Sequence, residues 1–366
     1  MSDSARPCIS GNLYINGQWI GTETSITNVS PSDTADVIGH FAQASLEHVS
    51  DAIAAANHAV GDWGRSPMET RYSVLMAIGN ELIERSRELG ELLAREEGKT
   101  HAEGIGEVYR SGQFFHYFAG EVHRQIDDRT DSVRPGIEVD TRREPVGVVA
   151  VISPWNFPMA TAVWKIAPAL AFGNSVVFKP ANLVPASAWA LTEIISRQSA
   201  LPAGTFNLVM GSGSTVGDAI INSDKIHAVS FTGSLPVGRE VAKATAANLV
   251  KCQLEMGSKN ALIVAADADL DVAVNAAFVG AYSGTGQKCT ASSRLIVDEA
   301  IHDQFVDKLV AKLRSTTVGH ALAEGVDMGP VASRQQLDEN LAWIEDGLSE
   351  GANLVFGGKP IQKSTE

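Results

Sequence analysis

Residues 146–158 read VGVVAVISPWNFP, an apolar run that ends abruptly in a turn bracketed by Pro154 and Pro158. Short apolar runs alternate with amphipathic stretches from here to residue 254. The apolar runs are residues 146–152, 175–178, 205–210, 227–231 and 249–254, and the amphipathic stretches are residues 159–172, 186–199, 215–221 and 237–247. This alternation predicts an α/β fold, in which helices cover both faces of a parallel sheet. Ligands of such sheets bind at the carboxyl ends of the strands.

The flanking segments differ from this region. Near the N-terminus, Asn16-Gly17 is the preferred pair for a tight hairpin, and it separates two β-like runs. Helical periodicity dominates from about residue 45 to 121, and the charged stretch 124–145 is too polar for a core and is expected to project as a pair of strands. Beyond residue 254 we expect strands at 261–264 and 294–297 and helices at 270–282 and 300–313.

Charge and composition exclude several classes of function. The chain has 29 Lys and Arg against 43 Asp and Glu, a net charge of −14 over 366 residues, which disfavours binding to nucleic acid or anionic lipid. No apolar stretch approaches the roughly 18–20 residues that a membrane span needs, and the N-terminus does not resemble a secretory signal. Three widely spaced cysteines and nine histidines match neither a disulfide framework nor a metal site. The chain is therefore expected to be cytoplasmic, with reduced thiols.

Three residues are candidates for chemistry. Cys289 lies in the polar sequence GQKCT, and the local sequence fits a nucleophile and a small buried hydrophobe about equally. Glu255 closes an apolar strand, where it is either a solvated carboxylate or a partly desolvated general base. Asn156 follows the first strand, where it either caps the next helix or donates a hydrogen bond to a developing oxyanion.

Other residues suit a bound nucleotide. Lys179 ends the second strand and is either a surface lysine or a ligand for a hydroxyl or phosphate. Ser234 is a plausible N-cap after Phe231-Thr232-Gly233, and that loop would present a helix N-terminus to a pyrophosphate. Gly211-Ser212-Gly213 with Gly217 resembles a dinucleotide fingerprint, but with the wrong spacing for GxGxxG, which makes the signal weak.

Five motifs in a fixed order carry a resemblance to a known family. PWNFP, FKPA, FTGS, LEMGSKN and GQKC occur in this order, with Asn156, Lys179, Glu255 and Cys289 at matching intervals. The chain resembles the NAD(P)-dependent aldehyde dehydrogenase superfamily from residue 13 to residue 330. Residues 110–120 and 289–294 are most similar to semialdehyde dehydrogenases of the 2-oxoglutarate semialdehyde type.

The resemblance implies a domain plan. It comprises a Rossmann-like parallel-sheet cofactor domain and an incomplete α/β catalytic domain. Residues 1–123 would be the mostly helical N-terminal part of the cofactor domain, residues 124–145 a projecting strand pair used in oligomerisation, residues 146–255 the NAD(P)-binding core and residues 256–366 the truncated catalytic domain. A full-length protein of this kind would be a homo-oligomer.

The resemblance also implies residue roles. The Cys289 thiolate would attack an aldehyde, the Asn156 amide would stabilise the resulting alkoxide, and Glu255 would activate the water that hydrolyses the thioester. NAD or NADP would bind at Ile152, Pro154, Trp155, Lys179, Ala181, Asn182, Gly213, Gly217, Phe231, Thr232, Gly233, Ser234, Met256 and Gly257. Arg110 would hold a distal carboxylate of the substrate, although a role as a helix-surface cation is at least as plausible.

Three departures from the family pattern bear on function. Ser258 replaces a second glycine, which adds a Cβ near the expected site. Asn182 is neutral where a carboxylate would repel a 2′-phosphate, so NADP is not excluded. Nothing after Pro330 matches the family's EIFGP-like motif or its terminal strand. The alternative function is therefore a truncated, catalytically impaired protein that binds only a cofactor or a partner.

Overall fold

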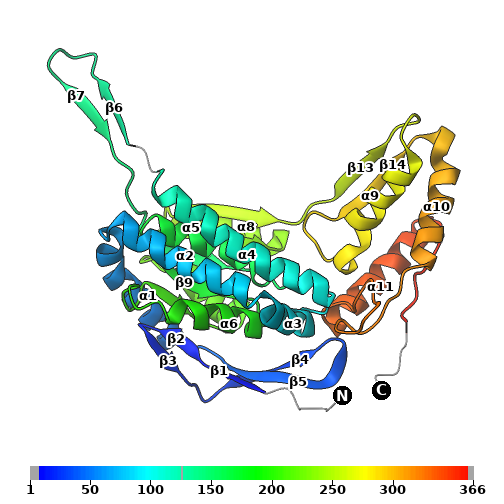
Figure 1. Cartoon of the computed structure of the whole chain (residues 1–366), viewed down its shortest axis with the longest axis horizontal. Helices are drawn as coiled ribbons and strands as arrows, with labels where there is room; N and C mark the ends of the chain where they lie inside the picture. Colours follow the sequence, from blue (N-terminus) through cyan, green and yellow to red (C-terminus); the bar gives the residue numbers. More distant parts are fainter. Residues whose placement is uncertain (1–7, 125–126, 362–366) are drawn as a thin grey trace.

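A seven-stranded sheet organises the larger part of the molecule (Figure 1). The computed structural model describes residues 8–124 and 127–361. The strand order is β12-β11-β8-β9-β10-β2-β3. The five strands from β12 to β10 run parallel, whereas β2 and β3 are antiparallel to their neighbours. The strands are β8 (Val148–Ile152), β9 (Ser175–Lys179), β10 (Phe206–Leu208), β11 (Ala228–Gly233), β12 (Lys251–Met256), β2 (Leu13–Ile15) and β3 (Gln18–Ile20).

The centre of this sheet is covered on both faces. All five residues of β9 are buried, as are four of the five in β8, which matches the continuous apolar runs in the sequence. Helices connect the strands as the alternation predicts. They are α5 (Ala160–Ala171), α6 (Pro185–Ser196), α7 (Asp218–Ile221) and α8 (Leu235–Ala247), with a single π-helical turn, η1 (Gly213–Gly217), before α7.

A helical layer precedes the parallel sheet in the chain and packs against it. It consists of α1 (Leu46–Gly64), α2 (Met68–Glu84), α3 (Ser86–Glu97) and α4 (His101–Val122). The α3 and α4 backbones approach closely at Gly90 and Gly104, where a Cβ on Gly104 would collide with the Gly90 carbonyl. Trp63 of α1 is fully buried, and its Nε1 donates to the Leu170 carbonyl of α5 at 2.9 Å. This contact anchors the helical layer to the sheet.

A second, smaller group of elements lies at the opposite end of the molecule from a projecting hairpin (Figure 1). It contains the parallel pair β13 (Asn260–Val264) and β14 (Ser292–Val297), with α9 (Leu270–Tyr282), α10 (His302–Arg314) and α11 (Arg334–Ser349). Two 3₁₀ turns, η2 (Ser283–Gly286) and η3 (Glu299–Ile301), belong to the same region. It has a small core of its own, formed by Val264, Val274, Ala277, Phe305 and Leu309.

The projecting hairpin consists of β6 (Asp128–Asp131) and β7 (Glu138–Thr141), and it falls in the stretch for which a strand pair was predicted. A separate three-stranded sheet, in the order β1-β5-β4, is formed by β1 (Ile9–Gly11), β4 (Ser25–Ser30) and β5 (Asp33–Ala42). In the part of the chain that the structure describes, no helix is long and apolar enough to cross a membrane.

The structure confirms the hairpin at Asn16-Gly17, whose φ angles are 51° and 77°. The sequence did not reveal that this hairpin extends the parallel sheet through an antiparallel pairing of β2 with β10. It also did not reveal α11. The other expected strands and helices are present, with ends that differ from the prediction by at most three residues.

Removing a ring from the centre of the sheet should destabilise the fold strongly. Phe178 is fully buried, with its ring centroid 6.3 Å from that of Phe206. We expect Phe178→Ala to lower the free energy of unfolding by about 3–5 kcal/mol in urea denaturation, because it leaves a cavity in the core. Phe356→Ala is the control, since that ring is exposed, and it should change the free energy by about 0.5 kcal/mol or less. Equal losses in the two variants would contradict this assignment of the core.

Candidate active site

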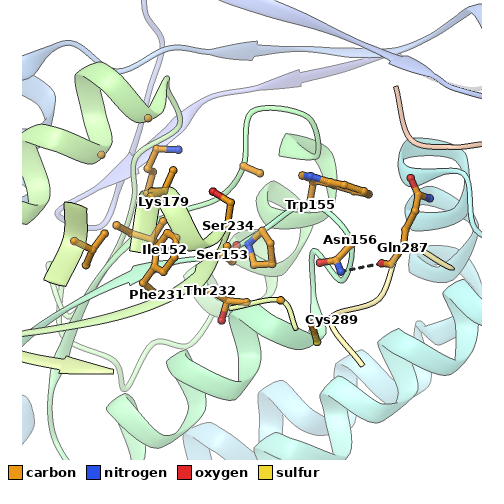
Figure 2. Close-up of a pocket in the computed structure, with 18 of the residues that line it drawn as sticks. Ile152, Ser153, Trp155, Asn156, Lys179, Phe231, Thr232, Ser234, Gln287 and Cys289 are labelled. Atoms are coloured by element: carbon orange, nitrogen blue, oxygen red, sulfur yellow. Dashed lines mark hydrogen bonds between the residues drawn. The ribbon is translucent and has the colours of Figure 1, made fainter. Parts of the chain in front are cut away.

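A cavity of about 840 Å³ opens at the carboxyl ends of β8, β9 and β11, where the parallel topology predicts a ligand site (Figure 2). Its size falls within the usual range for small-molecule pockets. One wall consists of residues after these strands and at the start of α8, and the other is the loop at 285–289. Two residues of α11, Gln336 and Asn340, also line it. The cavity therefore lies between the parallel sheet and the smaller group of elements.

Asn156 and the loop that carries Cys289 meet at this cavity. Asn156 Nδ2 donates to the Gln287 carbonyl at 2.8 Å, and both residues line the cavity together with Cys289. Asn156 does not cap the following helix, because the residue at the N-cap of α5 is Met159. This geometry excludes the capping alternative for Asn156 and brings its amide to the backbone two residues before the thiol.

The Cys289 loop is held by several hydrogen bonds. The Cys289 carbonyl accepts from Asn260 Nδ2 at 2.9 Å, and Lys288 Nζ donates to the Val279 carbonyl at 2.8 Å near the end of α9. Gly284, Thr285 and Gly286 all have positive φ, so the chain turns sharply before the cysteine. Cys289 is half-buried in the cavity wall and is not a core residue. A thiol in this position is accessible to a small molecule.

The start of α8 offers free donors to a ligand. Ser234 is at the N-cap position, but its side chain makes no capping hydrogen bond. Thr232 Oγ1 and Ser153 Oγ line the same cavity, and both are buried without a hydrogen-bond partner among the described residues. Leaving such groups unpaired costs about 1–3 kcal/mol each, so they indicate a polar ligand at this place. A helix N-terminus with free N–H groups suits the anionic part of that ligand.

Lys179 is the cation of this wall. It is only 5% exposed, its Nζ donates to the Pro180 carbonyl at 3.0 Å, and burial lowers its pKa to about 8. A Cβ on Gly217 would lie 3.8 Å from Lys179 Cε, so the glycine leaves room along the lysine stem. The surface-lysine alternative is therefore excluded, and the ammonium group remains available to the cavity.

Most of the residues predicted for the site line this cavity. They are Ile152, Pro154, Trp155, Asn156, Lys179, Ala181, Gly213, Gly217, Phe231, Thr232, Gly233, Ser234, Gly257 and Cys289. Asn182 and Met256 do not line it. Asn182 Nδ2 instead donates to Gln43 Oε1 at 3.3 Å, and the Met256 side chain packs against Gly238 of α8.

Of the two alternatives for Glu255, the structure shows the solvated carboxylate and not the partly desolvated one. Its side chain is exposed and lies outside the cavity lining, because β12 is the edge strand of the sheet. Gln253 Nε2 donates to Glu255 Oε1 at 2.6 Å, and Lys165 Nζ donates to Gln253 Oε1 at 3.3 Å. Burial lowers the pKa of Lys165 to about 8, while the nearby Glu255 opposes this shift. Glu255 is thus part of a polar chain on the α5 side of the strand.

Arg110 also lies outside the cavity lining, on the exposed side of α4. Its guanidinium donates to Gln113 Oε1 at 3.0 Å and stands 5.0 Å from the centroid of the Phe114 ring. Phe114 in turn packs edge-on against Trp164 of α5. The structure therefore groups Arg110 with aromatic rings beside α5, outside the lining of this cavity.

Several lining residues were not predicted from the sequence. Gln287 stands two positions before Cys289, and its side chain bonds both Thr285 Oγ1 and the Ala332 N–H. Gln336 and Asn340 were missed because α11 was not predicted. The apolar spacing of Leu337, Leu341 and Ile344 on that helix is the signal that could have revealed it. Residues 8–124 and 127–361 contain no group of three or more potential metal ligands.

Comparison with known proteins identifies the relatives of this chain. Residues 19–366 match the Aldehyde dehydrogenase family. The alpha-ketoglutaric semialdehyde dehydrogenase of Bacillus subtilis is 42% identical over 353 residues, which are 95% of this chain and 72% of that protein. The 2,5-dioxopentanoate dehydrogenase of Saccharolobus solfataricus is 39% identical over 347 residues, which are 94% of this chain and 72% of that protein.

Solved structures agree with these matches. A betaine aldehyde dehydrogenase from Staphylococcus aureus, in complex with NAD+, has a TM-score of 0.94 at 34% identity, over 97% of this chain and 70% of that one. An NADP dependent enzyme from E. coli has a TM-score of 0.93 at 34% identity, over 96% of this chain and 73% of that one. The similarity thus covers both the parallel sheet and the region that carries Cys289.

The buried charge of Lys179 should reduce stability. Because its pKa is about 8 in the folded state and near 10.5 in the unfolded chain, the cost of burying the charge is fully present below pH 8. As the pH rises from 8 towards 10.5, the folded protein loses this proton first, and its relative stability increases. We expect Lys179→Met to raise the free energy of unfolding at pH 7 by up to about 3 kcal/mol and to remove this pH dependence.

Urea denaturation at pH 7 and pH 9.5 measures both effects. Lys251→Met is the control, because Lys251 is exposed on β12. A Lys179 variant that is less stable than the wild type at pH 7, with an unchanged pH profile, would contradict the cost assigned to this charge.

Proposed function

The chain belongs to the aldehyde dehydrogenase family, and from that premise we propose that it oxidises a carboxylate-bearing semialdehyde to the acid with NAD or NADP. The substrate class is suggested by two relatives named for the same compound, which is called alpha-ketoglutaric semialdehyde or 2,5-dioxopentanoate. The observation that carries the proposal is the meeting of Cys289 and the Asn156 amide at the wall of the cavity.

The cavity fits a dinucleotide. Ser153 Oγ and Thr232 Oγ1 supply unpaired buried hydroxyls, the uncapped start of α8 supplies N–H donors, and Lys179 supplies a buried cation. We assign the pyrophosphate to Ser234 and its neighbours and a ribose to Lys179. When bound, the nicotinamide accepts the hydride that leaves the substrate carbon. One structural relative was solved in complex with NAD+ and another is an NADP dependent enzyme, which supports either cofactor.

The protein residues divide the reaction between them. The Cys289 thiolate forms a bond to the aldehyde carbon, and the carbonyl electron pair moves to the oxygen. The Asn156 Nδ2 and the Cys289 N–H donate hydrogen bonds to that alkoxide. Loss of hydride from the carbon re-forms the carbonyl and leaves a thioester on Cys289. Water then attacks the thioester, the carbon–sulfur bond breaks, and the carboxylic acid and the free thiol result.

We assign the activation of this water to Glu255. The carboxylate is solvent-exposed, which suits a base that must take up and release protons. It stands at the carboxyl end of β12, where Thr232 of the neighbouring strand, a cavity residue, is its register partner. Gln253, hydrogen-bonded to Glu255 at 2.6 Å, restrains the side chain in the present arrangement.

We assign recognition of the distal carboxylate to Arg110. Its guanidinium bonds the neutral Gln113, and no carboxylate lies within ion-pair distance of it in the described structure, so its charge is available to a ligand. The rings of Phe114 and Trp164 beside it offer an apolar surface for the carbon chain between the two ends of a semialdehyde.

We further propose a homo-oligomer and a cytoplasmic location. Every residue of β6 and β7 is exposed, including Val139, and the hairpin projects from the body as an interaction arm would (Figure 1). The cytosol keeps thiols such as that of Cys289 reduced, which supports this location. In this assignment residues 1–123 and 146–255 form the cofactor domain, residues 124–145 the arm, and residues 256–366 the catalytic region.

Replacing the nucleophile tests the reaction directly. We expect Cys289→Ala to abolish formation of NAD(P)H with 2,5-dioxopentanoate and to leave the dissociation constant of the cofactor, measured by calorimetric titration, within about twofold. The thiol takes part in the covalent step and not in holding the dinucleotide. Cys252→Ala is the control, because that thiol is exposed on β12 outside the cavity. Turnover that persists in Cys289→Ala would remove Cys289 from its role, and cofactor binding without turnover in the wild type would favour a binding protein.

Substrate charge tests Arg110. We expect kcat/KM to favour 2,5-dioxopentanoate over the uncharged five-carbon pentanal, and Arg110→Leu to reduce that preference about 10- to 100-fold, since a charge-assisted hydrogen bond is lost. Arg87→Leu, an exposed position on α3, serves as the control and should leave the preference unchanged. A wild-type preference for pentanal would refute the carboxylate site.

A further inference from the structure

A buried ion pair lies behind the turn that carries Asn156. Lys99 follows α3 and Glu107 lies on α4, and the Lys99 Nζ stands 2.7 Å from Glu107 Oε2. The side chains are 5% and 2% exposed. Neither residue lines the cavity, and neither belongs to a motif that the sequence analysis singled out.

The pair holds both ends of the turn. Lys99 Nζ also donates to the Asn156 carbonyl at 2.8 Å, and it lies 4.1 Å from the centroid of the Phe157 ring. Glu107 Oε1 accepts from the N–H groups of Met159 and Ala160, at 3.0 and 3.1 Å, at the start of α5. One ion pair thus fixes the backbone on both sides of Phe157 and Pro158.

A second buried glutamate shows what a purely structural carboxylate does in this fold. Glu96 Oε1 accepts from the Ala186 N–H at 2.6 Å and Glu96 Oε2 from the Ser187 N–H at 2.9 Å, so it caps the start of α6 as Glu107 caps α5. No lysine pairs with Glu96 in the described structure. The feature that distinguishes the Glu107 site is therefore the lysine that reaches the Asn156 carbonyl.

Stability alone does not account for such a lysine. A buried ion pair contributes little net stability, because the desolvation of two charges offsets their attraction. Its effect on rate can be much larger than its effect on stability. A displacement of about 1 Å of a hydrogen-bond donor at an oxyanion can lower the rate on the order of 100-fold. The contact from Lys99 to Asn156 acts on that position.

We propose that Lys99 and Glu107 are positioning residues, which fix the Asn156 turn so that the Asn156 amide meets the oxygen of the tetrahedral adduct on Cys289. This inference rests on the proposed roles of Cys289 and Asn156. The pair touches neither substrate nor cofactor, and it acts only through the backbone of residues 156–160.

Two reagents separate oxyanion stabilisation from the reactivity of the thiol. p-Nitrophenyl acetate acylates a thiolate through a tetrahedral oxyanion and releases p-nitrophenolate, whereas iodoacetamide alkylates the same sulfur by displacing iodide, with no oxyanion. Both reactions use the 366-residue protein without cofactor. Because Cys8 and Cys252 are exposed, every variant also carries Cys8→Ser and Cys252→Ser.

The test variant is Lys99→Met combined with Glu107→Gln, which removes both charges of the pair. Glu97 Oε2, 3.8 Å from Lys99 Nζ, is the buried carboxylate that remains, and burial already raises its pKa to about 7, so it can become neutral by taking up a proton. We expect the acylation rate to fall about 10- to 100-fold while the alkylation rate stays within about twofold. Asn156→Ala should slow acylation about 100-fold. Adding Asn156→Ala to the double variant should cause little further loss of rate, because both changes act on the same hydrogen-bond donor, Asn156 Nδ2. Glu96→Gln is the matched control and should leave both rates unchanged. Glu107→Gln alone provides a second variant of nearly native shape, which should slow acylation by a smaller factor.

The outcomes separate the two proposals. If Asn156→Ala slows acylation but the Lys99 and Glu107 variants do not, the positioning role is overturned and the proposed function stands. If acylation and alkylation fall together, the pair supports the fold in general and the inference is wrong. If the parent protein is not acylated at Cys289, or Asn156→Ala has no effect, the proposed function fails and the inference falls with it.

Discussion

The parallel pairing of β8 with β9 and β11 is the constraint on which the rest of the site depends. Ile152 is in register with both Lys179 and Phe231, so β8 and β9 end at the same level of the sheet and β11 ends two residues beyond it. The chain must leave each strand there, and it does so through Ser153, Pro180 and Ser234. Polar groups that are far apart in the sequence therefore lie close together at this edge of the sheet. The position of the cavity is therefore set by strand register, and the side chains determine what it can bind.

Much of this arrangement could be predicted because its signals are local. A fully buried parallel strand needs an unbroken apolar run, and each turn needs its own prolines, glycines and capping residues. Those patterns gave the five parallel strands, and the motifs at the strand ends gave most of the cavity lining, Lys179 and Thr232 included. The hairpin at Asn16-Gly17 was predicted for the same reason, since its two turn residues adopt positive φ.

What the sequence did not reveal depends on contacts between segments. Glu255 is exposed because β12 is at the edge of the sheet. The order of strands in a sheet cannot be predicted from the sequence of a single strand. The position of Arg110 follows from the way α4 lies on α5. The buried position of Lys99 could not be predicted for the same reason. A lysine in the polar sequence EEGKT is expected to be a surface charge. Only the close packing of α3 and α4 brings it under Asn156.

The two walls of the cavity, one at the strand ends and the start of α8 and the other at the Cys289 loop, are held by different sets of contacts. Lys179, Thr232 and Ser234 depend only on the parallel sheet and α8. The Cys289 loop instead depends on a contact between the sheet region and the smaller group of elements, from Asn156 Nδ2 to the Gln287 carbonyl. A second contact lies within the smaller group, from the Ala332 N–H to the Gln287 side chain. A further link joins the His101 N–H to the Ala321 carbonyl at the start of α4, two residues after Lys99. In the proposed roles, the pyrophosphate and ribose contacts lie on the sheet side of the cavity, whereas the thiol belongs to the smaller group and its loop is hydrogen-bonded to the Asn156 amide. The ion pair of Lys99 and Glu107 lies at this junction, which is why its effect should appear in the chemistry of Cys289 and not in the binding of the dinucleotide.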